Sequence, residues 1–447
     1  MSAILSDRFW DRFSPRLLWC CFLLFWGQIV FPTNSALGQL EFERPPIDYN
    51  ITPVNDRVAK LQQRIDRGEL TLRFDEKHGY LPDVLKQLDI SPSSQILVFS
   101  KTSFQLRCIS PKRPRALYFD ESTYIGWVQG GTVVEVASVD PQQGTIFYTL
   151  DQKKVKKPKF VRDRGRCLIC HASSRTAAVP GLLLRSVYTG RTGHPLAGTR
   201  TFTTDYRSPF IERWGGWYVS GTHGALRHMG NVISSNHSQP EKLDMEFGAN
   251  VTDLSKIVDI KPYLKPHSDL VALMILEHQT RMQNLIIRAN FEARSAIHYD
   301  EEMNRLFKRP RNFRTESTKR RIAAVTSKLL ECLLFSDEFK LTSKVSGSSN
   351  FAKEFARPGL RDHKDRSLRD LDLQTRLMKY PCSYMIYSKS FDSLPEAVKS
   401  KVYFGLWEIL KGKNTSKKYS HLSKTDRRTI LEILRTTKKD LPVYWKS

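Results

Sequence analysis

One short segment combines two cysteines and a histidine in a pattern that is typical of a cofactor-attachment site. Cys167, Cys170 and His171 form a C-x-x-C-H pattern within RCLICHASS, and the pattern occurs once in the chain. Two thiols one helical turn apart can each add to a vinyl group at the same edge of a porphyrin, and the following imidazole can bind the iron. The pattern therefore predicts one covalent haem c, with Cys167 and Cys170 as thioether sites and His171 as axial ligand.

Three other kinds of site use closely spaced cysteines. A disulfide between Cys167 and Cys170 would give no role to His171, but it stays an alternative, in which the chain is a non-redox envelope protein. A thioredoxin-like dithiol is expected in a βαβ unit, whereas a basic polar stretch precedes Cys167. A zinc site needs a second ligand pair, and the sequence has no second C-x-x-C and no H-x-x-x-H. Haem attachment is the favoured interpretation.

The sixth iron ligand is expected from the segment RWGGWYVSGTHGALRHMGN. Met229 would give His/Met ligation and a higher reduction potential, whereas His228 or His223 would give two histidine ligands. Trp214 and Trp217 alternate with glycine, so we expect these flat rings to line the porphyrin. Ordinary aromatic core and hydrogen-bonded turn residues are the alternatives for all of them.

A weaker ligand candidate lies further along the chain. Met274, His278 and Met282 share one face of an expected helix. A histidine on an apolar face is more often a core residue with its hydrogen bonds satisfied, and we expect this of His278. His194, in GRTGHPLAG, is expected in a turn.

The N-terminal segment predicts the compartment. Arg8, Arg12 and Arg16 precede the uncharged apolar run 17–31, and Ala36-Leu37-Gly38 places small residues where a signal peptidase cleaves. This order predicts a secretory signal peptide over residues 1–38 and a periplasmic or secreted protein; an uncleaved membrane anchor is the alternative. Export agrees with the motif, because c-type haem is attached outside the cytoplasm.

The number of cysteines and the mean hydropathy narrow the class of protein further. Of seven cysteines, Cys20 and Cys21 lie in the apolar run, so the remainder are too few for a disulfide scaffold. Cys108 and Cys382 are a candidate pair, and Cys332 is expected to be buried in a helix. A mean hydropathy of −0.42 excludes a polytopic membrane protein.

The chain is strongly basic. Lys and Arg number 71 against 46 Asp and Glu, a formal charge of +25. Residues 151–200 hold twelve of the basic residues against two Asp, so the excess surrounds the motif. We expect an acidic redox partner protein, with membrane or envelope association as a second use of the charge. Nucleic acid is not expected outside the cytoplasm, and a solvated basic face is the alternative.

Periodicity predicts an α+β fold. Strands are expected in SQILVFS, RALYFD, STYIGWVQ, GTVVEVASV and GTIFYTL, and one earlier helix in NDRVAKLQQRID. Later helices are expected at 268–308, 318–336, 395–411 and 425–437, the last opened by a capping box from Ser423 to Asp426. The regions after the signal peptide are then a β-rich part at 39–150, an irregular haem-binding part at 151–245 and a helical part at 246–447.

The segment FVRDRGRCLICHASS resembles the haem-attachment site of c-type cytochrome domains. Together with SQILVFSKTSFQ, GTIFYTLDQ, RWGGWYVSGTHGALRHMGN, LVALMILEHQTRMQN and YPCSYMIYS, it is similar to large exported monohaem cytochrome-c-domain proteins of planctomycete-type bacteria, over about residues 90–445. The resemblance implies electron transfer, with Cys167 and Cys170 holding the haem and His171 binding its iron.

Two redox functions remain open from the sequence. One is a periplasmic electron carrier with a six-coordinate haem. The other is a monohaem redox enzyme, peroxidase-like or reducing a small oxidant, with an open or labile sixth iron position. The size of the chain favours an enzyme or a subunit of a complex, and Arg227 with His223 and His228 is its candidate acid–base set.

Overall fold

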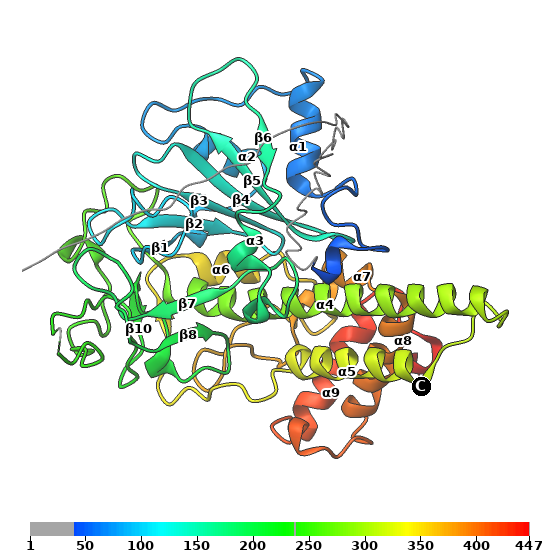
Figure 1. Cartoon of the computed structure of the whole chain (residues 1–447). Helices are drawn as coiled ribbons and strands as arrows, with labels where there is room; N and C mark the ends of the chain where they lie inside the picture. Colours follow the sequence, from blue (N-terminus) through cyan, green and yellow to red (C-terminus); the bar gives the residue numbers. More distant parts are fainter. Residues whose placement is uncertain (1–39, 237, 447) are drawn as a thin grey trace, which may run out of the picture. The chain divides into compact units, whose positions relative to one another are not determined.

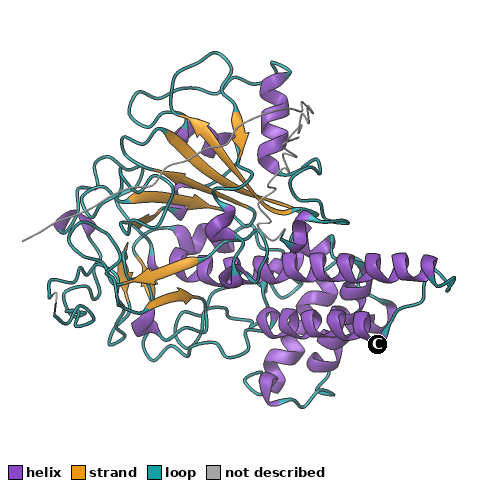
Figure 2. Cartoon of the chain, in the orientation of Figure 1, coloured by secondary structure: helices purple, strands orange, loops and turns teal. Residues whose placement is uncertain are grey.

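The expected strands form an antiparallel meander in the computed structural model, which describes residues 40–236 and 238–446 (Figures 1 and 2). Each strand pairs with the next one along the chain; short turns join the last four strands, whereas the longer segment 99–114 joins the first two. The turn between the last two uses Gly144 at φ +73°, which favours glycine. The strands are β1 (Ile96–Val98), β2 (Arg115–Phe119), β3 (Thr123–Trp127), β4 (Val133–Asp140) and β5 (Gly144–Asp151).

Two short strands from the expected haem-binding part complete this sheet. β6 (Phe160–Arg162) pairs with β5, and β9 (Trp217–Tyr218) pairs with β1, so the strand order is β6-β5-β4-β3-β2-β1-β9. In this register Trp217 lies opposite Val98. Neither added strand is long enough for alternating apolar and polar residues to be recognised in the sequence.

Different elements cover the two faces of the sheet. On one face, the Tyr148 hydroxyl donates to Asp56 Oδ2 at 2.6 Å, and Asp56 caps α1 (Arg57–Asp66). On the other, Gln279 of α4 (Leu270–Leu306) donates from Nε2 to the Tyr124 hydroxyl at 2.7 Å. We call the second surface the α4 face. Opposed residues in the register put Tyr124 and Phe147 on this face.

The helices expected in the C-terminal half are confirmed, and with the sheet they confirm the α+β fold class. α4 and α5 (Glu316–Leu333) pack side by side, and α8 (Glu396–Leu410) contacts α5. α9 (Lys424–Thr437) begins with the expected capping box between Ser423 and Asp426. The shorter helices are α2 (Leu81–Gln87), α6 (Phe351–Ala356) and α7 (Lys389–Asp392).

The part between sheet and helices has little regular structure, as expected. α3 (Leu168–His171) carries the C-x-x-C-H pattern, and β7 (Leu184–Val187) pairs with β8 (Thr201–Thr204). β10 (Gly221–Thr222) pairs with β11 (Ser346–Gly347) from the helical half. YPCSYMIYS, which the sequence does not assign to helix or strand, forms a 3-10 helix at Tyr384–Tyr387.

The three regions expected after residue 38 share one compact unit from residue 40 onward. A single cluster of buried apolar side chains runs through the sheet, α3 and the helices. The predicted signal peptide lies outside the described residues. Among the described helices, none is long and apolar enough to cross a membrane.

Candidate haem-attachment site

Asp163 shapes the turn that leads into α3. Its Oδ1 accepts from the backbone N–H of Gly165 at 3.1 Å and of Cys167 at 2.9 Å, and its Oδ2 lies 3.1 Å from Arg166 Nε. Burial alone would raise the pKa of this carboxyl, but those N–H donors and the guanidinium outweigh burial and hold the pKa below its ordinary value. A charged Asp163 therefore fixes the backbone at the first cysteine.

His171 is held by its backbone-facing nitrogen. Nδ1 lies 2.8 Å from the carbonyl oxygen of Gly181, and the ring packs against Phe147 on the α4 face with centroids 5.0 Å apart. Burial lowers the pKa of His171, so the ring is neutral at pH 7. A neutral ring next to a carbonyl carries its proton on Nδ1, which leaves the Nε2 lone pair for a metal. No protein atom in the described residues hydrogen-bonds to Nε2.

The two motif cysteines are free thiols with different exposure. Cys167 is half-buried, and burial followed by the charge of Asp163 raises the pKa of its thiol to about 12. Cys170 is exposed, beside Ile169, whose side chain is 79% exposed. A reactive dithiol has a lowered thiol pKa, so the environment of Cys167 is the reverse of a thioredoxin-like site.

A half-buried part of the α4 face lies beside the motif. Arg115 and Glu135 form an ion pair there, with Nη1 and Oε2 2.6 Å apart, and both charges act on the titration of His171. The register places Trp217 on this same face, at the far edge of the sheet. Its Nε1 donates to the carbonyl of Arg185 at 2.7 Å. The sheet thus presents one of the two expected haem-lining tryptophans on the face that His171 contacts.

The other aromatic candidates form a separate buried cluster. His223 and His228 have ring centroids 4.7 Å apart, and Trp214 lies 5.2 Å from His228. Leu226 O and the Asn250 N–H bind the two nitrogens of His223, at 2.7 and 3.0 Å. Burial lowers the pKa of His228 to about 3, so its ring is neutral. Within the described residues, the ring contacts of this cluster do not include His171.

Met229 and Arg227 also have partners other than the motif. The Met229 sulfur accepts from Ser186 Oγ at 3.6 Å, on β7. Arg227 forms a two-point ion pair with Glu246, through Nε and Nη2, each 2.7 Å from a carboxylate oxygen. Within the described residues, the residues proposed for the sixth ligand and for a distal acid–base set share no hydrogen bond, ion pair or ring contact with His171.

The remaining sequence candidates have ordinary structural roles. His278 is fully buried, with Nε2 2.7 Å from Ser383 Oγ and its ring stacked 4.1 Å from Phe335. Its buried Nδ1 has no hydrogen-bond partner in the described residues, so only one of the two nitrogens is satisfied as expected. His194 lies in an exposed turn, and Cys332 is buried in α5, as expected. Cys108 and Cys382 are both free thiols.

Sequence reasoning missed a buried charged group beside the aromatic cluster. Arg213 Nη1 lies 2.9 Å from Glu277 Oε2, and both side chains are almost fully buried. Arg213 also donates to the carbonyls of Tyr206 and Ser208. Burial raises the pKa of Glu277 to about 7, although Arg213 opposes the shift. Because 64 residues separate the pair, only the way that α4 passes the 205–215 loop brings them together.

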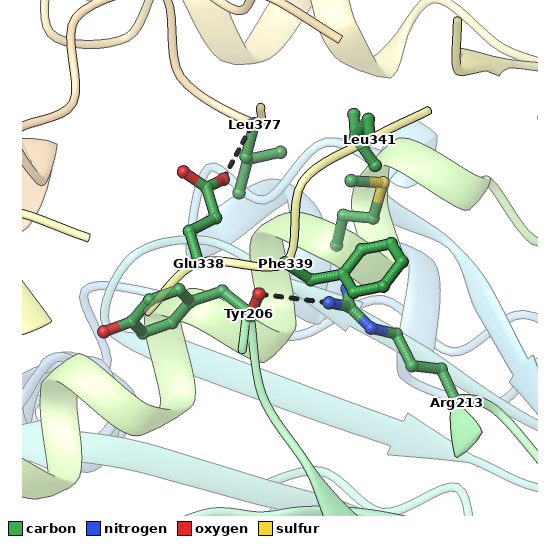
Figure 3. A pocket seen from close by; sticks show the side chains of 7 residues that line it. Tyr206, Arg213, Glu338, Phe339, Leu341 and Leu377 are labelled. Carbon is green, nitrogen blue, oxygen red and sulfur yellow. Dashed lines mark hydrogen bonds between the residues drawn. The ribbon is translucent and has the colours of Figure 1, made fainter. Parts of the chain in front are cut away.

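A small pocket adjoins this ion pair (Figure 3). Glu338 lies on its wall and accepts from the backbone N–H of Leu377 at 2.8 Å; burial raises the pKa of its carboxyl to about 7. The pocket is lined by Tyr206, Arg213, Met274, Glu338, Phe339, Leu341 and Leu377. No sequence pattern joins these positions.

The comparisons with known proteins identify no relative. No family model, no curated protein and no solved structure matches the chain. In the described part of the chain, no three His, Cys, Asp or Glu side chains gather as a metal-binding cluster.

The residues on α3 fit a covalently held haem. The two free thiols, of Cys167 and Cys170, are one helical turn apart. The neighbouring imidazole of His171 uses Nδ1 in a hydrogen bond, and its Nε2 has no protein partner in the described residues. A porphyrin supplies the iron's other equatorial ligands itself, so this donor set needs no further protein ligand nearby for attachment.

Proposed function

We propose that this protein is an exported c-type cytochrome that carries one covalent haem and transfers electrons in the periplasm. The observation that supports it most is the hydrogen bond from His171 Nδ1 to Gly181 O, because it orients a neutral imidazole for iron. The haem would supply the one-electron chemistry of its iron when bound. The N-terminal sequence supports export. The resemblance to monohaem cytochrome-c-domain proteins agrees with export and with a covalent haem.

The chain's own residues have separate tasks in this proposal. Cys167 and Cys170 would hold the porphyrin edge, and His171 would hold the iron. Asp163 fixes the backbone N–H of Cys167, and Phe147 fixes the plane of the imidazole. The exposed Cys170 and Ile169 leave one side of the motif open to solvent, where an acidic redox partner protein would approach a basic surface.

The experiment is a visible spectrum of the protein after export in a host with c-type maturation. The wild-type chain is expected to keep a Soret band through denaturation, because thioethers survive unfolding. Cys167→Ser with Cys170→Ser is expected to lose all covalent haem, whereas Cys332→Ser, a cysteine outside the motif, is expected to keep it. Absence of any Soret band from the wild-type chain would overturn the proposal and favour the disulfide alternative.

His171→Ala tests the axial ligand separately from attachment. Both thiols remain, so covalent haem is expected to be retained, while the iron loses a strong-field ligand and its reduced spectrum changes. His194→Ala, in an exposed turn, is the matched control and is expected to leave the spectrum unchanged. An unchanged spectrum for His171→Ala would remove this residue from the iron site.

A monohaem redox enzyme with an open sixth position is the second candidate. The hydrogen bonds at both His223 nitrogens, and at the Met229 sulfur, support this second candidate, because they occupy two of the residues proposed as sixth ligand. Carbon monoxide added to the reduced protein distinguishes the two. Rapid binding supports the enzyme, and slow or absent binding supports the carrier.

A further inference from the structure

The loop that joins α4 to α5 carries exposed apolar and basic side chains together. Its sequence RLFKRPRNFR, residues 305–314, holds five basic residues and no acidic one. Every residue from 305 to 313 is exposed. The apolar members are Leu306, Phe307 and Phe313, which are 69%, 58% and 43% exposed. Tyr299, which precedes this loop on α4, is 59% exposed. We call residues 305–314 the hairpin tip.

The hairpin tip projects from the body of the molecule. Figure 1 shows the last turns of α4 running beyond the helices beside it before the chain returns into α5. A protruding loop buries little of its own surface, so its apolar side chains find no cover within the described structure. Large exposed apolar side chains on such a loop cost free energy in water and mark an interaction site.

The tip has a defined conformation. The buried side chain of Asn304 donates to the carbonyl of Phe313 at 2.9 Å, and Arg309 N–H donates to the carbonyl of Asn304 at 2.8 Å. Arg314 Nη1 donates to the carbonyls of Arg311 and Phe313 at 2.8 and 2.9 Å. The loop is therefore braced in a shape that leaves its apolar side chains outside.

One basic group of the tip, the guanidinium of Arg309, lies against two aromatic rings. The guanidinium carbon of Arg309 is 5.0 Å from the ring centroid of Phe307 and 5.3 Å from that of Phe313. Arg305 pairs with Glu302, and Arg314 with Glu301 at 3.3 Å. Lys308, Arg309 and Arg311 have no carboxylate partner in the described structure, so their charge is available to an anionic surface.

We propose that the hairpin tip binds the surface of an anionic lipid bilayer. Phenylalanine and leucine enter the boundary between headgroups and acyl chains, and neighbouring Lys and Arg bind the anionic headgroups. A narrow convex tip offers little area for a stable protein interface but inserts readily between lipids. The proposal is independent of the haem, because it rests on residues 305–314 and on none of the motif residues.

The test is flotation of the full chain with vesicles, either phosphatidylcholine alone or phosphatidylcholine mixed equally with phosphatidylglycerol. Wild-type protein is expected to float with the anionic vesicles and to release at high salt. Leu306→Ser with Phe307→Ser and Phe313→Ser is expected to lower binding by about tenfold or more. The matched control is Phe247→Ser, which alters a phenylalanine that is 62% exposed elsewhere.

A second pair of variants tests the charge. Lys308→Gln with Arg309→Gln and Arg311→Gln is expected to remove the preference for anionic vesicles. The control removes three exposed lysines elsewhere, at Lys340, Lys344 and Lys424, and is expected to keep that preference. The N-terminal apolar run is the same in every variant, so any vesicle binding by that run is constant. A difference in binding between a tip variant and its control therefore comes from the tip. Their urea unfolding midpoints should match the wild type, because the altered side chains are exposed.

Hydrogen exchange locates the contact. Amides of residues 305–314 are expected to exchange more slowly with anionic vesicles than without them. Unchanged flotation of the apolar triple variant, or protection confined to another segment, would overturn the proposal. Loss of electron exchange with an acidic redox protein in the tip variants, with vesicle binding intact, would instead make the tip a protein-docking surface.

Discussion

At the residue scale, the Arg115–Glu135 ion pair provides charges close to His171 on the α4 face. Both side chains are half-buried, so their charges are less screened than those of a surface pair. A buried negative charge stabilises the oxidised form of a metal centre and a positive charge stabilises the reduced form. The pair can therefore set the reduction potential of an iron bound to His171 without touching it.

Neutralising each partner in turn tests this role. If the proposed haem is bound, Glu135→Gln is expected to raise its reduction potential, and Arg115→Gln to lower it, by on the order of tens of millivolts. Redox titration followed by visible absorbance measures both shifts. Arg314→Gln, which removes a guanidinium from the hairpin tip, is the control; shifts of the same sign in Glu135→Gln and Arg115→Gln would count against an electrostatic cause.

The carboxyl of Glu338 makes folding stability depend on pH. Burial raises its pKa to about 7, above the value of about 4.3 for an unfolded chain. The folded state therefore holds a proton that the unfolded state loses, and stability falls as pH rises from about 5 through 7. The slope is at most about 1.4 kcal/mol per pH unit for this proton.

Urea denaturation at pH 5, 6, 7 and 8 measures that slope. Glu338→Gln keeps an acceptor for the Leu377 N–H and cannot titrate, so its stability is expected to depend less on pH than that of the wild type. Glu76→Gln, at an exposed carboxyl, is the control. Equal slopes for Glu338→Gln and the wild type would mean that Glu338 is charged in the folded protein.

At the scale of elements, α4 connects the sheet to the helical half. Its N-cap, Asp269, accepts from the backbone N–H of Val271 at 2.8 Å and of Ala272 at 3.1 Å. The same carboxylate accepts from the N–H and hydroxyl of Ser349 at 2.9 and 2.6 Å. One buried side chain thus begins the longest helix and ties a distant loop to it.

Asp269→Ala is expected to destabilise the protein by about 2–4 kcal/mol, because it removes a helix cap and leaves the Ser349 donors unsatisfied. The change in the free energy of unfolding, measured by urea denaturation, checks this. Asp253→Ala removes the cap of a single 3-10 turn, Leu254–Lys256, and is expected to cost less than about 1 kcal/mol. Similar losses for the two variants would show that the Ser349 contacts contribute little.

At the scale of the whole molecule, the positive charge is exposed around the motif. Arg164 and Arg175 lie on either side of α3, both exposed and without an ion pair in the described structure. Positive charge beside an electron-transfer site raises the encounter rate with anionic partners, and salt screens the effect.

Arg164→Gln with Arg175→Gln is expected to slow electron exchange with ferricyanide at low ionic strength by at least about twofold, because the local field weakens. Stopped-flow absorbance at several salt concentrations measures the rate. Arg320→Gln with Lys340→Gln removes the same charge elsewhere and is expected to change the rate less. Equal slowing by the two double variants would indicate that only net charge matters.

The sequence by itself predicted the elements whose signals are local. The five strands between residues 94 and 150 and the later helices follow from periodicity, and the Ser423–Asp426 cap follows from a four-residue pattern. The motif Cys167, Cys170 and His171 is local too, because its chemistry depends on spacing within one helical turn. β6 and β9 escaped prediction, since strands of two or three residues have too few positions for a pattern.

The surroundings of the motif depend on contacts that no local pattern in the chain predicts. Contacts between residues far apart in sequence place Phe147 and Gly181 at His171, Trp217 on the same sheet face, and His223 with His228 in a cluster of their own. The Arg213–Glu277 pair likewise exists because α4 passes a particular loop. Contacts between distant residues depend on how whole elements pack together to fill the interior. Local patterns in one sequence predict those elements but do not give the distances between them.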